Sequence, residues 1–238
     1  MRQVPHYLII GNGRVARHFL HYFNLLNIQC DNWHRQESFA LLSEKINQAT
    51  HILILISDSE IEKFAEMHLR HTDAMLIHFS GSLVSEKIFG AHPLMCFNPT
   101  LYSDDQYPKI PFIIDHDAPD FESLLPGLPN QHVRLNKEQK AKYHALCVMS
   151  GNFSCILWQK LFSGLEKEFQ IPAEIAHGYL MQQTNNLIQN PKTALTGPLV
   201  RNDKNTLEKN ISALANDPFQ TIYKSFVTCY EQLQKVSS

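Results

Sequence analysis

Residues 7–16 read YLIIGNGRVA, and residues 16–26 continue as ARHFLHYFNLL. A short apolar run is followed by a glycine turn and then by a segment of helical character, which is the context of the dinucleotide-binding pattern G-x-G-x-x-G/A. In that pattern Gly11 permits the sharp turn, Gly13 lets the backbone approach a pyrophosphate, and Ala16 is small enough for close packing of helix on strand. We therefore predict that the first free N–H groups of the helix face a diphosphate, whose negative charge the helix dipole favours.

The composition of the chain excludes several classes of protein. Its 238 residues suffice for one large or two small domains with a buried core. The formal charge is −2 and the basic residues form no block, which argues against nucleic acid or an anionic membrane as a partner. No stretch approaches the ~18 apolar residues of a membrane span, and no signal peptide precedes the glycine turn. We expect a soluble, cytoplasmic protein that acts on a small molecule.

The spacing of cysteine and histidine indicates no metal site. The five cysteines include no C-x-x-C pair, as expected of reduced thiols. The thirteen histidines form neither H-x-x-x-H nor H-E-x-x-H, so we expect no metal.

The first half of the chain alternates strand and helix signals. After the strand before the glycine turn, further strands are predicted at residues 28–34, 51–56, 74–79, 109–115 and 132–135. The run HILILI is apolar throughout, as in a strand that is covered on both faces. Repeated strand–helix units of this kind predict a doubly wound α/β sheet, which is a Rossmann domain.

The second half of the chain has helical character throughout. No strong helix breaker occurs before Pro172, so residues 137–169 are predicted as one helix that is ~50 Å long. Further helical stretches follow, which predicts an all-α C-terminal domain. We place the boundary near residue 135, with a dinucleotide-binding domain at 1–135 and a helical substrate or dimerisation domain at 136–238.

The end of the predicted second strand bears on the choice of cofactor. Enzymes that bind NAD place an acid there for the ribose 2′-hydroxyl, whereas those that bind NADP place an arginine near the 2′-phosphate. Asp31 is expected within the strand, and His34 and Arg35 are expected at its tip. Arg35 offers a bidentate fork for a phosphate, with His34 and Ser38 as helpers. The pattern favours NADP over NAD; the alternative is that Arg35 is a solvated loop residue.

Two pairs of small polar residues follow later apolar strands. They are Ser57-Asp58 and Ser80-Gly81. Ligands of open α/β sheets sit outside the carboxyl ends of the strands, so both pairs are expected to border the cofactor. Ordinary turn chemistry is the alternative, because Ser, Asp and Gly dominate such turns.

Residues 90–97 read GAHPLMCF, an apolar segment around one His-Pro pair. We predict a loop there. His92 is either held rigidly at a cleft or is a satisfied buried histidine in a structural turn.

The long predicted helix carries Tyr143-His144 and, two turns later, Gly151-Asn152. His144 and Asn152 are separated by ~12 Å along the axis and ~80° around it, so both could line one elongated cleft. His144 is a candidate proton donor near neutral pH, and Asn152 a candidate for orienting a substrate carbonyl or the nicotinamide amide. Alternatively, Gly151 marks only a place where another helix packs closely.

The segment 194–198 (ALTGP) predicts a turn between helices. Thr196 could present a hydroxyl, and the nearby Arg201 a guanidinium, to an anionic substrate. An ordinary turn beside a surface pair of Arg201 and Asp203 is the alternative.

These segments, in this order, resemble a known family. The residues that carry the resemblance are the glycine turn, His-Phe-Ser-Gly at 78–81, Ala-His-Pro at 91–93, Tyr-His at 143–144, Asn152 and Ala-Leu-Thr-Gly-Pro at 194–198. Over nearly its whole length the chain resembles bacterial Rossmann-like oxidoreductases with a C-terminal helical domain of unknown function. These are similar to pyrroline-5-carboxylate reductases and to the 6-phosphogluconate dehydrogenase-like group. The resemblance implies a C-terminal domain like theirs, NAD(P) bound between the two domains, and homodimers joined through the helical domain.

The chain departs from its apparent relatives at two places. They tend to have Arg-Gly-Asp where this chain has Arg-Asn-Asp at 201–203, so the tight turn that glycine allows is not carried over. The Lys-x-x-x-Asn pair of β-hydroxyacid dehydrogenases is also missing from the sequence, so their mechanism is not carried over either.

Together these observations predict an NADP-dependent oxidoreductase that transfers hydride between the nicotinamide and a small C=O or C=N substrate. The predicted cofactor-binding residues are Gly11, Asn12, Gly13, Arg14, Val15, Ala16, His34, Arg35, Ser57, Asp58, Ser80 and Gly81. The candidate catalytic residues are His144, Asn152 and Thr196. A non-catalytic NAD(P)-binding sensor or scaffold protein is the alternative, because the sequence shows no evident acid–base dyad.

Overall fold

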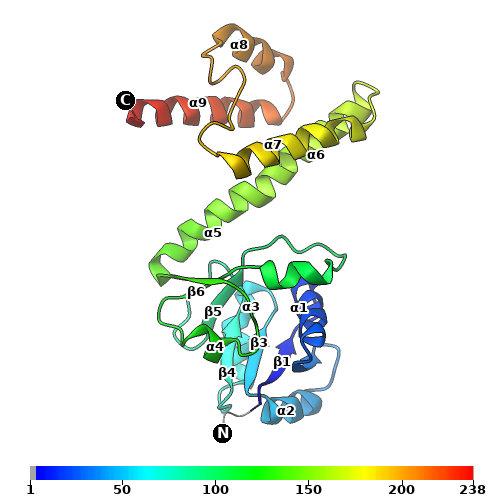
Figure 1. Cartoon of the computed structure of the whole chain (residues 1–238), viewed down its shortest axis with the longest axis vertical. Helices are drawn as coiled ribbons and strands as arrows, with labels where there is room; N and C mark the ends of the chain where they lie inside the picture. Colours follow the sequence, from blue (N-terminus) through cyan, green and yellow to red (C-terminus); the bar gives the residue numbers. More distant parts are fainter. Residues whose placement is uncertain (1–3, 238) are drawn as a thin grey trace. The chain divides into compact units, whose positions relative to one another are not determined.

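The computed structural model describes residues 4–237, and the chain divides into two compact units after Ile156 (Figure 1). The first unit is α/β, and the second is helical in the residues described. The predicted fold class, a doubly wound Rossmann domain followed by an all-α part, is confirmed. Within residues 4–237, no helix has both the length and the apolar character needed to cross a bilayer.

A seven-stranded sheet forms the centre of the described part of the first unit. Its strands are β1 (His6–Ile10), β2 (Gln29–Trp33), β3 (His51–Ile54), β4 (Met75–His78), β5 (Phe89–Pro93), β6 (Phe112–Asp115) and β7 (His132–Leu135). They are arranged in the order β2-β1-β3-β4-β5-β6-β7. Neighbouring strands are parallel except β5 and β6. The strand order reverses between β1 and β3, and such a reversal opens a crevice at the carboxyl ends of these strands.

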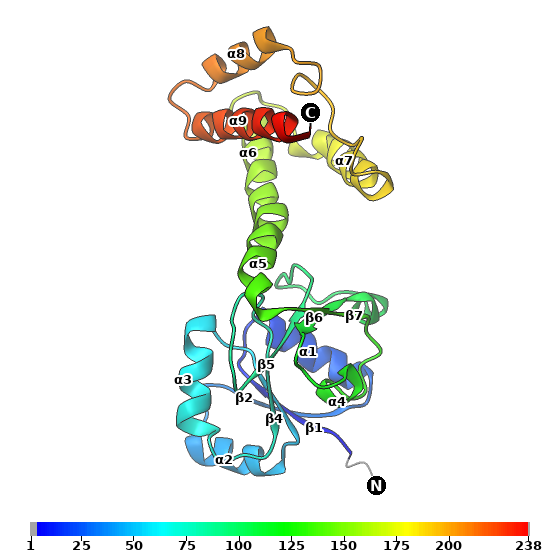
Figure 2. The ribbon, with the colours of Figure 1, turned by 90° about the vertical axis from the view of Figure 1, so that its left-hand side faces the viewer.

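Helices cover both faces of this sheet, as Figure 2 shows. They are α1 (Arg14–Leu25), α2 (Phe39–Gln48), α3 (Asp58–His68), α4 (Phe121–Leu124) and the 3₁₀ turn η1 (Asp104–Lys109). Alternating residues of β1 face the two layers: Tyr7 and Ile9 are buried with α1 and α4, whereas Leu8 and Ile10 are buried with α2 and α3. A strand that is buried on both faces requires an unbroken apolar run, which is why this strand was predictable.

The strand β5 corrects the prediction of a loop at residues 90–97. Gly90 and Ala91 give no strand signal, yet both are buried, and His92 pairs with Ile113 of β6. A Cβ at Gly90 would lie 2.3 Å from Nζ of Lys140. The small residues of β5 are therefore explained by long-range packing, which a local pattern does not reveal.

The helix predicted at residues 137–169 is divided into four elements. They are the 3₁₀ turn η2 (Lys137–Gln139), α5 (Lys140–Val148), the π-helical turn η3 (Met149–Phe153) and α6 (Ser154–Lys167). The Ser154 hydroxyl donates to the carbonyls of Ser150 and Gly151, within the widened turn. A side chain that enters the helical hydrogen-bond ladder in this way can bend a helix or open a π turn.

The second unit consists of helices and turns in the residues described. Besides most of α6, it contains the 3₁₀ turn η4 (Ala173–Ala176) and the helices α7 (His177–Gln189), α8 (Lys204–Ala213) and α9 (Phe219–Ser237). Asn202 adopts a φ of 52°, a left-handed conformation that asparagine tolerates, so a turn is formed here without glycine. The domain boundary at residue 135 stays a prediction: the last strand ends there, whereas the compact units divide within α6.

A buried ion pair attaches α5 to the sheet. Lys140 begins α5, and its Nζ lies 2.6 Å from Oδ1 of Asp115, the last residue of β6. The two side chains are only 5% and 2% exposed. Oδ2 of Asp115 accepts a hydrogen bond of 2.7 Å from the backbone N–H of Gly90. One carboxylate thus connects β5, β6 and α5.

We expect Lys140→Met to lower the free energy of unfolding by ~3–5 kcal/mol, because it leaves the Asp115 carboxylate buried and unpaired. Urea unfolding followed by circular dichroism measures the loss. Adding Asp115→Asn should restore much of it, since an amide keeps an acceptor for Gly90 without the charge. Lys109→Met, which breaks an exposed pair with Asp105, is the control and should leave the urea midpoint unchanged. A double variant as unstable as Lys140→Met alone would contradict this explanation.

Candidate functional site

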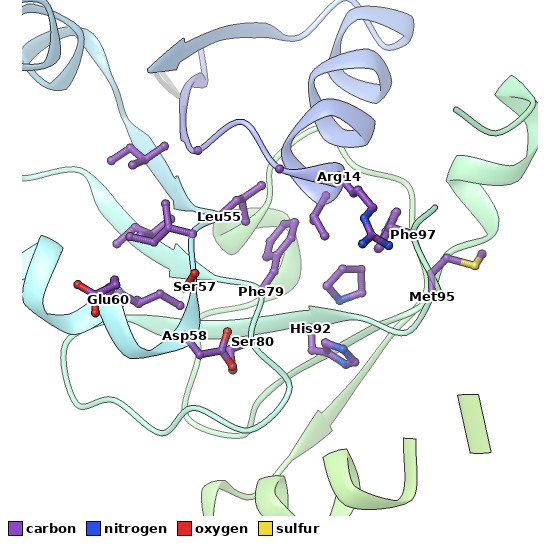
Figure 3. Close-up of a pocket in the computed structure, with 18 of the residues that line it drawn as sticks. Arg14, Leu55, Ser57, Asp58, Glu60, Phe79, Ser80, His92, Met95 and Phe97 are labelled. Carbon is purple, nitrogen blue, oxygen red and sulfur yellow. The ribbon is translucent and has the colours of Figure 1, made fainter. Parts of the chain in front are cut away.

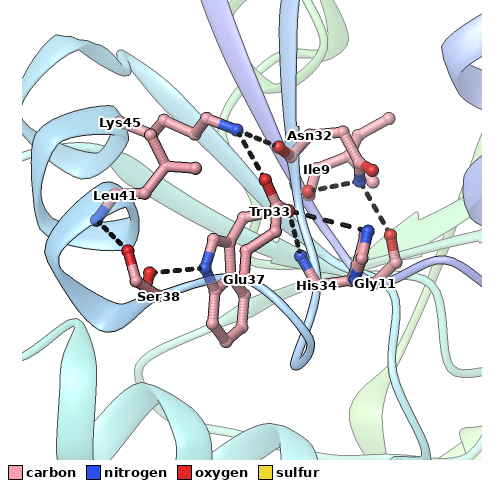
Figure 4. A network of polar contacts seen from close by, with 9 residues as sticks. All are labelled: Ile9, Gly11, Asn32, Trp33, His34, Glu37, Ser38, Leu41 and Lys45. Carbon is pink, nitrogen blue, oxygen red and sulfur yellow. Dashed lines mark hydrogen bonds and ion pairs between the residues drawn. The ribbon is translucent and has the colours of Figure 1, made fainter.

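The glycine turn after β1 is fixed by its neighbours on both sides, and Figure 4 shows the contacts on the side of β2. Gly11 has a φ of +130°, and a Cβ there would lie 2.2 Å from the carbonyl oxygen of Leu55. On the other side, the backbone N–H of Gly11 donates to the Trp33 carbonyl at 2.8 Å. The side-chain amide of Asn32 donates to the carbonyls of Gly11 (2.7 Å) and Ile9 (2.9 Å). Only glycine fits this position, and these contacts restrict the backbone of the turn to one conformation.

Gly13 is different, because the fold does not require a glycine there. Its backbone is extended, with φ −76° and ψ −175°, which any residue can adopt. A Cβ at Gly13 would have no described atom within 4 Å. Gly13 is the N-cap of α1, and no side chain of the described residues caps this helix. The N–H groups of the first turn are therefore available to an anion.

These free N–H groups border a cleft of about 1820 Å³ that lies wholly within the first unit (Figure 3). The glycine turn, the ends of β2 to β5, α3, α5 and η3 supply its walls. The predicted site residues that line it are Gly11, Asn12, Gly13, Arg14, Val15, His34, Arg35, Ser57, Asp58, Ser80, His144 and Asn152. One opening thus brings together both halves of the predicted site.

Three predicted site residues lie elsewhere. Ala16 is buried in the core, where α1 packs on the sheet. The backbone of Gly81 lies against the His144 ring, because a Cβ at Gly81 would be 2.5 Å from Cδ2 of His144. Thr196 belongs to the second compact unit, so it is not among the residues around this cleft.

The loop after β2 separates the candidate acid from the candidate cation. Oδ2 of Asp31 lies 2.7 Å from Nε2 of His6, and Asp31 is not among the cleft residues. Glu37, which we did not single out from the sequence, accepts a 2.9 Å hydrogen bond from the His34 N–H. That bond is the main cause that lowers the pKa of Glu37. Arg35 is exposed at the cleft and has no acidic partner among residues 4–237.

Aromatic side chains near this loop were also missed in the sequence. The rings of Phe39 and His68 are stacked at 4.9 Å, and Phe64 lies 4.8 Å from His68. Trp33 contacts both phenylalanines, at 5.6 and 5.7 Å. All four residues line the cleft, so this end of it offers flat apolar surfaces beside Arg35. They come from β2, α2 and α3, and only the fold brings them together.

At the opposite end of the cleft, polar side chains gather where β4 and β5 end. The Ser80 hydroxyl donates to the Asp58 carboxylate. Nδ1 of His92 lies 2.8 Å from the Tyr143 hydroxyl, and the rings of His92 and His144 are 5.9 Å apart. Burial lowers the pKa of His92 to about 4, with further lowering by His144. Of the two interpretations of His92 given above, its position at the cleft fits the first, although it lies on a strand.

Comparisons with known proteins give one family and many similar folds. The family model described as a domain of unknown function (DUF2520) matches residues 110–229. No curated protein matches the chain.

Three of the similar solved structures are named as an oxidoreductase, a reductive aminase and an imine reductase. The putative NADP oxidoreductase from Bacteroides fragilis is 19% identical, with a TM-score of 0.76, over 96% of this chain and 98% of that one. The reductive aminase from Aspergillus terreus in complex with NADPH and ethyl levulinate is 15% identical, with a TM-score of 0.60 over 98% and 94%. The imine reductase from Myxococcus stipitatus, a variant in complex with NAD⁺, is 14% identical, with a TM-score of 0.58 over 98% and 95%. At these identities the likeness shows the fold.

Proposed function

The chain belongs to the DUF2520 family, a domain of unknown function, and from that premise we propose that it is an NADP-dependent oxidoreductase. It transfers hydride between the nicotinamide and a small substrate with a C=O or C=N bond. The observation that carries this proposal is Gly13. The packing of the protein does not require a glycine at this position, which is the uncapped N-terminus of α1 and lines the large cleft. A pyrophosphate bound close to the backbone would explain why a glycine occupies position 13.

The two ends of the cleft suit the two ends of a dinucleotide. The aromatic surfaces of Phe39 and His68 suit an adenine, and Arg35 suits a 2′-phosphate beside it. When bound, the nicotinamide supplies the hydride. The protein positions the substrate, excludes water and transfers the proton that accompanies the hydride. The names of similar structures include complexes with NADPH and with NAD⁺, so the preference for NADP rests on Arg35.

The substrate side of the proposal uses residues of α5 and η3. His144 and Asn152 line the same cleft, where an imidazole and a carboxamide can bind a carbonyl or the nicotinamide amide. Thr196, which belongs to the second compact unit, stays a prediction. The π turn of η3 supports this assignment, because such turns are frequent at functional sites.

We expect Gly13→Ala to raise the Kd for NADPH at least ~10-fold, because the methyl group occupies the space of a charge-assisted hydrogen bond to the diphosphate. Isothermal titration calorimetry measures Kd. The melting temperature should fall by only a few degrees, since alanine is a weaker N-cap by ~1 kcal/mol or less. Gly178→Ala is the matched control, because Gly178 also has open space around it but lies in α7. If the wild-type protein binds neither NADPH nor NADH at millimolar concentration, the proposed function is wrong.

Arg35→Gln tests the choice of cofactor. We expect the Kd for NADPH to rise ~10–100-fold, because a hydrogen-bonded charge pair with the 2′-phosphate contributes about 1.5–3 kcal/mol. The Kd for NADH should stay within ~3-fold, since NADH has no 2′-phosphate. Arg70→Gln, at an exposed arginine paired with Glu66 on α3, is the control. An equal loss of affinity for both nucleotides would contradict the assignment.

We also propose that the protein is a homodimer joined through its helical unit. That unit exposes many large apolar side chains: Ile175, Tyr179, Met181, Ile188, Phe226 and Leu233 are each more than half exposed. Monomers rarely expose large apolar patches, which commonly mark interfaces. Light scattering should give twice the chain mass of 27.4 kDa. A mass of one chain at micromolar concentration would contradict the dimer.

A further inference from the structure

We infer that His92, held in place by Tyr143, is the catalytic group that donates a proton to the acceptor atom of a neutral carbonyl substrate. The inference rests on the proposed function and assigns a residue and a substrate class to it. Tyr143 acts through His92 and is a positioning residue.

The first argument is the position of the His92 ring. His92 lies on β5, one residue from its end, and its side chain points into the cleft (Figure 3). Strand pairing with Ile113 fixes its backbone, and the hydrogen bond of Nδ1 to Tyr143 fixes its ring. Nε2 has no protein partner in the described part of the chain and is not among the buried unpaired atoms. This nitrogen is therefore free to meet a ligand.

The second argument is the direction of the hydrogen bond. A phenol is a good donor, and an unprotonated imidazole nitrogen is a good acceptor. Burial and the thiol of Cys147 raise the pKa of Tyr143, so its hydroxyl keeps its proton. We assign the donor role to the Tyr143 hydroxyl and the acceptor role to Nδ1 of His92, which places the imidazole proton on Nε2. The cleft receives an N–H donor of fixed direction.

The third argument is the charge around His92. The titratable groups that face it or interact with it are Asp58, His78, Lys140, Tyr143 and His144. Burial, His144 and Lys140 disfavour the imidazolium, and only Asp58 favours it. The ring is therefore neutral throughout the physiological range. A neutral N–H donor requires a lone pair on the substrate, which a carbonyl oxygen has and an iminium cation lacks.

The proton balance of a reduction follows from these contacts. Hydride adds to the carbonyl carbon while the Nε2 proton of His92 passes to the oxygen, which gives an alcohol. The hydroxyl proton of Tyr143 passes to Nδ1, so the imidazole stays neutral. The tyrosine oxygen is reprotonated from bulk solvent, so one turnover consumes the carbonyl compound, one NADPH and one proton. A neutral imidazole that polarises a carbonyl has precedent in enzymes.

Turnover tests this role. The probes are a panel of aldehydes, ketones and 2-oxo acids, with NADPH oxidation followed by absorbance. His92→Ala should lower kcat by ~10²–10⁴-fold, the usual contribution of a positioned proton donor. The Kd for NADPH should change less than ~3-fold, because His92 faces the substrate. Tyr143→Phe should lower kcat at least ~10-fold, because it releases the ring and removes the proton that keeps the imidazole neutral. His116→Ala, at an exposed position outside the cleft, and Tyr223→Phe, which loses an exposed hydrogen bond with Asn210, are the matched controls.

The pH profile and the tautomer separate His92 from an ordinary acid. The wild-type kcat should vary less than ~2-fold between about pH 6 and pH 9, whereas an imidazolium donor loses ~10-fold per pH unit above its pKa. Nitrogen NMR of the cofactor-free protein, with His92→Ala for assignment, should show a neutral His92 with its proton on Nε2. Loss of that fixed tautomer in Tyr143→Phe would support the positioning role.

Several outcomes would overturn the inference. They are a proton on Nδ1, a kcat that survives His92→Ala, a kcat that falls with pH as for an imidazolium, and NADPH binding without reduction of any carbonyl probe. Each of these leaves NADPH binding, and hence the nucleotide part of the proposed function, intact. Failure of the wild type to bind NADPH overturns the proposed function and the inference together.

Discussion

The ion pair between Lys140 and Asp115 determines how the substrate end of the cleft is built. Asp115 ends β6 and also binds the backbone of Gly90, so the carboxylate needs a strand neighbour without a side chain. Lys140 begins α5, and the next turn of that helix carries the tyrosine that reaches His92. The pair thereby sets the distance between β5 and α5. A buried charge pair is costly to form, but it holds one arrangement once formed, because either charge alone would be buried without compensation.

The nucleotide end is fixed by an independent set of contacts. The turn at Gly11 lies between Leu55 of one neighbour and the Asn32 amide of the other, and neither contact involves α5. The cleft therefore has two anchors, each of which connects neighbouring strands. Damage at one anchor should leave the other end intact, since distant sites without shared partners act additively. This separation explains why binding of a nucleotide and chemistry on a substrate can be tested by different variants of this chain.

The sequence predicted what depends on neighbours along the chain and missed what depends on neighbours in space. The glycine turn was recognisable because strand, turn and helix follow each other within twenty residues. Asn32, by contrast, acts across two strands, and its role required the pairing of β1 with β2. The strand β5 was missed because Gly90 is small to make room for a distant ion pair. At the π turn the local feature is one serine hydroxyl bonded to two carbonyls, a signal too slight to predict the turn from sequence.

The charge distribution of the cleft follows from the same geometry. His78 is fully buried, its Nδ1 accepts from the Ser80 N–H at 3.2 Å, and burial lowers its pKa to about 3. With His92, this makes two uncharged imidazoles near Lys140, whose charge Asp115 already balances. A further cation there would face the charge of Lys140 and the cost of burial, with only Asp58 as an opposing charge. Among residues 4–237, the arginines that line the cleft without an acidic partner are Arg35, at the other end, and Arg14, at the start of α1 (Figure 3). The cleft is therefore suited to an anionic tail at one end and an uncharged reacting group at the other.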